Sequence, residues 1–126
     1  MGPFLLDTST LIWTMAAPER LSRKARTAVR SGTPVVSVIS YWEVMVKCKK
    51  GLLSVGDPLN WWQVATESLA AEVLSIRATH VAALRDLPDV HRDPFDRMLI
   101  AQAISEGLTL LTSDSSIRRY PVATCW

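Results

Sequence analysis

Short apolar runs alternate along the chain with longer segments of helical periodicity. One of these runs, Val35–Ile39, has no polar face, which is typical of a strand covered on both sides in a parallel sheet. The expected strands, the last of them at an edge, are Phe4–Leu6, Val35–Ile39, Glu72–Ile76, Leu108–Thr112 and Val122–Trp126.

The segments between these strands repeat apolar residues at helical spacing, and several of them stop at glycine or proline. Gly51 and Gly107 suit the position just after a helix, while Pro18 and Pro88 interrupt the helical pattern. The expected helices are Thr10–Ala16, Arg20–Arg30, Tyr41–Lys50, Asp57–Leu69, Thr79–Leu87 and Pro94–Glu106, with a short one at Ser115–Tyr120.

Alternation of strands and helices predicts an α/β fold, a three-layer α/β/α sandwich with a mainly parallel central sheet. The chain has 126 residues without a repeat or a long linker, so we expect one domain over residues 1–126. Ligands of open parallel sheets bind beyond the carboxyl ends of the strands. Candidate functional residues are therefore expected where a strand ends.

Four carboxylates lie at the starts of expected helices, and three of these starts directly follow a strand. They are Asp7, Glu43, Asp96 and Asp114. Each has a purely structural explanation. Ser40 with Glu43, and Asp93 with Asp96, have the spacing of an N-cap and an N3 residue, while Asp7 and Asp114 suit turns or caps.

The four acids together point to chemistry rather than to capping alone. In a parallel sheet Asp7, Glu43 and Asp114 come to one edge, and Asp96 starts the helix beside them. Crowded carboxylates repel one another unless a cation is present, and Mg²⁺ or Mn²⁺ prefers oxygen ligands. Such a metal orients a phosphodiester and activates water, so the pattern favours phosphodiester hydrolysis.

The runs LLDTST, SYWEVMVKCKKGLL, HRDPFDRMLIAQA and LTLLTSD, in this order and spacing, resemble the PIN-domain ribonucleases. The similarity is greatest to the VapC toxins of bacterial toxin–antitoxin pairs, and it extends from Leu5 to Trp126. It implies a three-layer α/β/α fold, a homodimer, an endoribonuclease that depends on Mg²⁺ or Mn²⁺, and inhibition by a cognate antitoxin protein.

The same resemblance assigns roles to individual residues. Asp7 and Asp96 match the direct metal ligands, whereas Glu43 and Asp114 complete the acidic cluster through waters or a second metal. A small hydroxyl residue two positions after the first acid, here Ser9, often hydrogen-bonds within the site. Many relatives have His at the position of Ser9 and Phe at that of Ile117, departures that affect the subgroup and not the chemistry.

Basic residues near the acids are candidates for contacts with RNA phosphates. Lys47 lies one helical turn after Glu43, so an ion pair and a phosphate contact are both consistent with its position. Arg97, next to Asp96, is a second candidate. His91 has no nucleophile partner in a motif and is expected to fix the loop before Asp93.

The tryptophans are predicted to be mainly core residues. Trp13 and Trp42 fall on faces that we expect to point inward. Trp61 and Trp62 are adjacent, so at least one of them is expected to face outward, where it suits an interface.

Composition limits the remaining possibilities. Hydrophobic residues make up 48%, and 14 Lys+Arg against 12 Asp+Glu give a net charge of +2, so the surface outside an acidic site is basic enough for a polyanion. The two cysteines are too few for a disulfide framework. Neither a basic leader nor a run of roughly 20 apolar residues is present, which predicts a cytoplasmic protein without a membrane span.

Three alternatives stay open at this stage. An aspartyl-phosphate phosphatase usually has a second Asp two residues after the first, whereas here the pattern is Asp7-Thr8-Ser9. A non-catalytic binding module would use the acids only as helix caps and would gain no stability from metal. A PIN-domain nuclease without a toxin role would lack an antitoxin gene beside its own.

Overall fold

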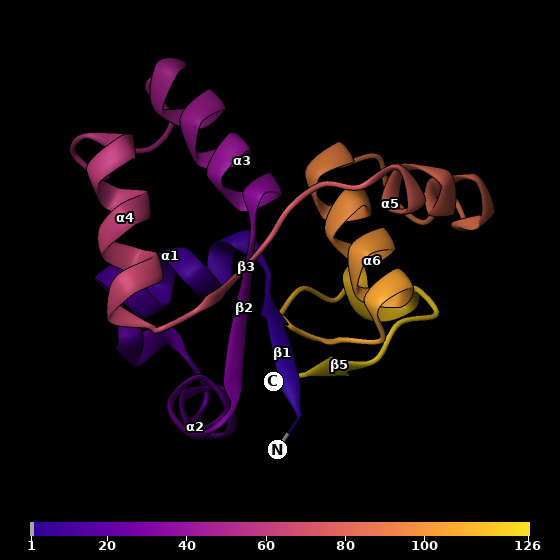
Figure 1. The fold of residues 1–126 in the computed structure, drawn as a ribbon, viewed down its shortest axis with the longest axis horizontal. Helices are drawn as coiled ribbons and strands as arrows, with labels where there is room; N and C mark the ends of the chain where they lie inside the picture. The colour runs from indigo at the N-terminus through magenta and orange to yellow at the C-terminus, as the bar shows by residue number, and fades with distance from the viewer. Residues whose placement is uncertain (1) are drawn as a thin grey trace.

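The central layer of the computed structural model, which describes residues 2–126, is a five-stranded sheet in the order β3-β2-β1-β4-β5 (Figure 1). Every pair of neighbouring strands is parallel. The strands are β1 (Pro3–Leu6), β2 (Thr33–Ser37), β3 (Glu72–Leu74), β4 (Thr109–Leu111) and β5 (Thr124–Cys125). The predicted α/β fold with a mainly parallel sheet is thus confirmed.

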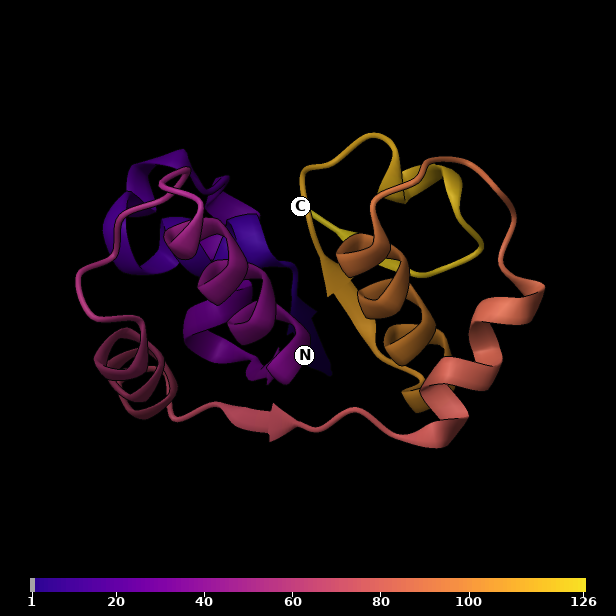
Figure 2. The ribbon, with the colours of Figure 1, turned by 90° about the horizontal axis from the view of Figure 1, so that it is seen from above.

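Helices cover both faces of this sheet (Figure 2). They are α1 (Thr8–Ala16), α2 (Arg23–Ser31), α3 (Val38–Lys49), α4 (Pro58–Ser68), α5 (Ala78–Ala83) and α6 (Pro94–Glu106). Short 3-10 turns lie at Pro18–Arg20, Leu84–Asp86 and Ile117–Arg119. None of the helices in residues 2–126 has the length and apolar character to cross a bilayer.

Alternating side chains of each inner strand enter two separate cores. Leu5 and Leu110 pack into the core under α5 and α6, whereas Leu6 and Leu111 pack into the core under α1 to α4. All four side chains are completely buried. An uninterrupted apolar sequence therefore reflects a strand with a core on each face, as expected for the interior of a parallel sheet.

The order in which strands are added to the sheet reverses at the junction of β1 and β4. From β1 it moves through β2 to β3, and then returns to place β4 and β5 on the other side of β1. Leu6 pairs with Leu111 at this junction. In open α/β sheets such a switch point forms a crevice beyond the strand ends, which is where ligands bind.

The boundary between β2 and α3 differs from the sequence prediction. β2 ends at Ser37, and α3 already begins at Val38 with Ser37 as its N-cap, because the Ser37 hydroxyl accepts from the Ile39 N–H at 3.0 Å. The predicted capping box of Ser40 and Glu43 is therefore wrong. Ser40 is buried in the first turn of α3, where its hydroxyl contacts that of Thr8 at 2.9 Å.

Two aromatic predictions also need correction. Trp42 is 55% exposed and not a core residue; its ring lies edge-on to Phe95, with 5.0 Å between centroids, where α3 meets α6 at the surface. Trp61 is buried, and Trp62 is half-buried because it stacks on Tyr41 at 4.7 Å. Neither member of this adjacent pair is fully exposed, since α4 turns one toward the core and the other along α3.

Candidate functional site

Asp7 lies at the carboxyl end of β1, beside the switch point of the sheet. It is only 5% exposed, and its two carboxylate oxygens have different donors. Oδ1 accepts from the Thr10 N–H at 2.8 Å, so Asp7 itself is the N-cap of α1, and Oδ2 accepts from the Thr112 hydroxyl. Burial raises the pKa of Asp7, and these hydrogen bonds only partly oppose that effect.

Asp114 reaches the same edge of the sheet from β4. Its backbone N–H donates to the Thr112 hydroxyl at 3.0 Å, so Thr112 connects Asp7 and Asp114 directly. The negative charge of Asp114 contributes to the raised pKa of Asp7. One Asp114 oxygen also accepts from the Ser116 N–H at 2.7 Å, which shows that this acid both caps a turn and faces the cluster.

Glu43 projects from the second turn of α3 and is 4% exposed. Its Oε2 forms an ion pair with the Lys47 ammonium at 2.6 Å, one helical turn away. Its Oε1 is buried without any hydrogen-bond partner. A buried carboxylate oxygen without a partner is costly, so this atom needs a cation or a donor that the polypeptide does not supply.

Asp96 completes the cluster from the first turn of α6. Asp93 is the N-cap of this helix and accepts from the N–H groups of Phe95 and Asp96. Burial raises the pKa of Asp96 to about 6, a hydrogen bond from His91 lowers it, and the nearby charges of Asp93, Glu43 and Asp7 raise it further. The charges of Glu43 and Asp7 thus act on Asp96, and the charge of Asp114 acts on Asp7, so the four predicted acids form one electrostatically coupled group.

His91, Tyr120 and Arg97 form a chain of contacts that ends at Asp96. His91 Nε2 lies 3.2 Å from Asp96 Oδ2, and His91 Nδ1 lies 2.8 Å from the Tyr120 hydroxyl. The Arg97 guanidinium donates to that same hydroxyl at 3.0 Å and to the Pro88 carbonyl at 2.8 Å. Arg97 thus holds the Tyr120 hydroxyl, which in turn contacts His91. The contact of Arg97 with RNA stays a prediction.

Sequence reasoning missed several of these supporting residues. His91 was predicted only to fix its loop, although its position five residues before Asp96 could have indicated a contact between the two side chains. Thr112 and Tyr120 carried no signal, because their roles depend on contacts between distant segments. Ser9 is exposed, and no hydrogen bond of its side chain occurs in the part of the chain that the structure describes; its predicted role at the site stays untested.

The donor set fits a hard divalent cation held in part by water. In residues 2–126 no three His, Cys, Asp or Glu side chains converge closely enough to enclose an ion by themselves. Mg²⁺ is usually held by one or two carboxylates and keeps several waters, so it does not need such a cage. The buried Glu43 Oε1 without a partner, and the burial that raises the pKa values of Asp7 and Asp96, fit a site that favours a cation.

Without metal, the stability of the protein should fall as the pH rises. The folded-state pKa of Asp96, about 6, lies above its usual value of 3.8, so folding favours the protonated acid. The resulting stabilisation is complete below about pH 4 and is lost as the pH rises through about 6. In EDTA at pH 7 we expect Asp96→Asn to raise Tm by about a few degrees.

Thermal unfolding followed by circular dichroism from pH 4 to pH 7.5 measures this effect. The variant Asp86→Asn, at an exposed carboxylate, should retain the wild-type pH dependence. An Asp96→Asn protein with the same pH dependence as the wild type would contradict the proposed crowding of the acids.

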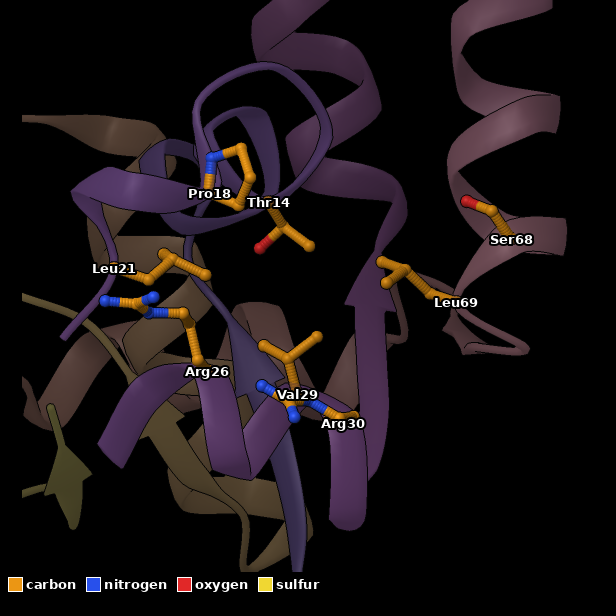
Figure 3. Close-up of a pocket in the computed structure, with 8 residues that line it drawn as sticks. All are labelled: Thr14, Pro18, Leu21, Arg26, Val29, Arg30, Ser68 and Leu69. Atoms are coloured by element: carbon orange, nitrogen blue, oxygen red, sulfur yellow. The ribbon is translucent and has the colours of Figure 1, made fainter. Parts of the chain in front are cut away.

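A separate groove lies away from the carboxylates, between α1, α2 and the end of α4 (Figure 3). Its volume is about 370 Å³. Figure 3 shows Leu21, Val29 and Leu69 reaching into it from three segments of the chain. Two arginines of α2 also line it; the complete lining is Thr14, Pro18, Leu21, Arg26, Val29, Arg30, Ser68 and Leu69. This apolar and basic surface has no part in the acidic cluster.

Comparisons with known proteins identify the family of the chain. The PIN domain family model matches residues 4–123. A relative named Ribonuclease VapC22, from Mycobacterium tuberculosis (strain ATCC 25618 / H37Rv), is 32% identical over 133 residues, covering 100% of both chains.

Two solved structures share the fold at low sequence identity. VapBC2 from Rickettsia felis, bound to a DNA fragment from its promoter, matches with a TM-score of 0.72 and 16% identity over 98% of each chain. DNA-bound VapBC from Salmonella typhimurium matches with a TM-score of 0.71 and 21% identity, covering 99% of this chain and 98% of the other.

Proposed function

The chain belongs to the PIN-domain family, and we propose that it is a metal-dependent endoribonuclease that acts as the toxin of a type II toxin–antitoxin pair. The observation that carries the proposal is the cluster of Asp7, Glu43, Asp96 and Asp114 at the switch point of the sheet, with a buried carboxylate oxygen that lacks a partner. The VapC22 relative, similar over its full length, supports the toxin role.

Asp7 and Asp96 are the residues that would hold the cation, with Glu43 and Asp114 completing its surroundings. A divalent ion in this site supplies Lewis-acid chemistry for phosphodiester hydrolysis by water. The chain's own contribution is orientation: Thr10 and Thr112 each fix one oxygen of Asp7, and His91 fixes one oxygen of Asp96. Because these carboxylates are already held in position, little conformational entropy is lost when the substrate binds.

We propose Mg²⁺ or Mn²⁺ as the ion, because the nearby donors are carboxylates, which suit hard cations. The proposed substrate is RNA, whose phosphates would otherwise be repelled by four acids, so a cation must invert the local charge. Exposed basic residues on α2 and at the end of α3 are the proposed contacts for the phosphate backbone of the RNA. They are Arg23, Lys24, Arg26, Arg30, Lys49 and Lys50.

We further propose a cognate antitoxin protein as the partner, a homodimer as the assembly, and the cytoplasm as the compartment. The antitoxin fits the groove between α1, α2 and α4, since Leu21 and Val29 offer apolar contacts while Arg26 and Arg30 favour an acidic segment. A surface of this kind suits an amphipathic acidic helix.

The function is tested by incubating the purified chain with total cellular RNA, with and without metal. We expect cleavage with Mg²⁺ or Mn²⁺, complete loss of cleavage in EDTA, and recovery when the ion is restored. Circular dichroism should show an intact fold in EDTA, because two apolar cores and not the ion hold the chain together. Undiminished cleavage in EDTA would falsify the proposed mechanism, whereas unfolding in EDTA would indicate a structural metal.

A further inference from the structure

Lys47 holds a permanent positive charge against the acidic cluster. Its ammonium lies 2.6 Å from Glu43 Oε2; the Glu43 side chain is only 5% exposed, whereas the Lys47 side chain is 43% exposed, so the ion pair is buried on the side of the carboxylate. The ordinary pKa of a lysine ammonium is about 10.4, and a buried carboxylate beside it favours the charged form. Lys47 therefore stays charged.

The two oxygens of Glu43 are in different situations. Oε2 accepts from the Lys47 ammonium, whereas Oε1 is buried and has no hydrogen-bond partner. The other basic side chains near the acids contact groups other than Glu43: Arg97 contacts Tyr120, Pro88 and Asp89, and His91 contacts Asp96. Within the described residues, only Lys47 forms an ion pair with Glu43.

We propose that the Lys47 ammonium takes the place of a second metal ion, so that the carboxylate cluster binds one divalent cation per chain. Lys47 neutralises one oxygen of Glu43 and leaves the other available to the single ion or its water shell. A second dication on Glu43 Oε2 would lie within contact distance of the ammonium, where like charges repel strongly. The inference rests on the proposed function, because it concerns the cation of the same site.

The test counts Mn²⁺ ions on the metal-free protein without RNA. Isothermal calorimetry gives the stoichiometry, and electron paramagnetic resonance separates an isolated Mn²⁺ from a spin-coupled pair. We expect one ion with an isolated spectrum for the wild type and for Lys47→Arg, which keeps the charge. For Lys47→Met we expect two ions per chain and a spin-coupled spectrum.

Lys49→Met is the matched control, since it removes an exposed positive charge from the same helix. It should bind one ion, like the wild type. If Lys47→Met does not fold, Lys47→Gln serves the same test. The inference is overturned if the wild type binds two ions or if the folded uncharged variant still binds one.

RNA cleavage measured in parallel separates this inference from the proposed function. One Mn²⁺ in the wild type and two in Lys47→Met, without any cleavage, would support the inference and overturn the nuclease function. Two ions in a wild type that cleaves RNA would overturn only the inference. A wild type that binds no Mn²⁺ would overturn both.

Discussion

Asp7→Asn and Asp96→Asn should each lower the rate of RNA cleavage by about a thousandfold or more, because a bound metal supplies several kcal/mol of transition-state stabilisation and each 1.4 kcal/mol is tenfold in rate. Both substitutions remove a negative charge from the cluster while keeping the size of the side chain. The amide oxygen of Asn still accepts from the Thr10 N–H, so α1 keeps its N-cap.

Asp57→Asn is the matched control for this prediction. Asp57 caps α4 by accepting from the Leu59 N–H at 3.1 Å, as Asp7 caps α1, but it is exposed. The control should therefore retain wild-type cleavage. Initial rates on one RNA with saturating Mn²⁺ measure the effect, and circular dichroism verifies the fold. Full activity of either cluster variant would show that the catalytic residues lie elsewhere.

Most of the fold follows from local signals that the structure confirms. The helix Pro94–Glu106 was predicted with both of its bounds, since Asp93, Pro94 and Gly107 each have a direct role at a helix end. The apolar run Val35–Ile39 predicted a strand covered on both sides, and β2 indeed lies between β1 and β3, although it ends at Ser37. The acids at the strand ends followed from the parallel topology.

The remaining features depend on contacts between distant segments. Ser37 ends β2 and caps α3 because its hydroxyl also meets the buried Gln102 of α6, 65 residues away in the sequence. Local spacing favoured Ser40 as the cap because Glu43 follows it by three residues, and the helix was therefore expected to start too late. The bracing of Asp96 by His91 and Tyr120 likewise joins segments 29 residues apart.

The acidic cluster and the groove of α1, α2 and α4 are chemically opposite surfaces. The cluster concentrates negative charge, whereas the groove is lined by Leu21, Val29 and Leu69 together with two arginines. α1 connects them, since Asp7 caps its first turn and Thr14, near its end, lines the groove. α1 is thus the element that the acidic cluster and the groove have in common.

Val29→Glu should weaken binding of the cognate antitoxin on the order of 100-fold, because a buried anchor of an interface is typically worth 2 kcal/mol or more. The half-buried Val29 lines the groove, and a carboxylate there would both remove apolar contact and repel an acidic segment. Calorimetry or surface plasmon resonance with the purified antitoxin measures the affinity.

Val81→Glu, at an exposed position of α5 across the molecule, is the matched control and should bind normally. Val29→Glu alone should still cleave RNA, because Val29 is not part of the acidic cluster. The rate should be lower than that of the wild type, since the new carboxylate lies beside Arg26 and Arg30 of the proposed RNA path. Unchanged antitoxin affinity in Val29→Glu would place the antitoxin on another face of the protein.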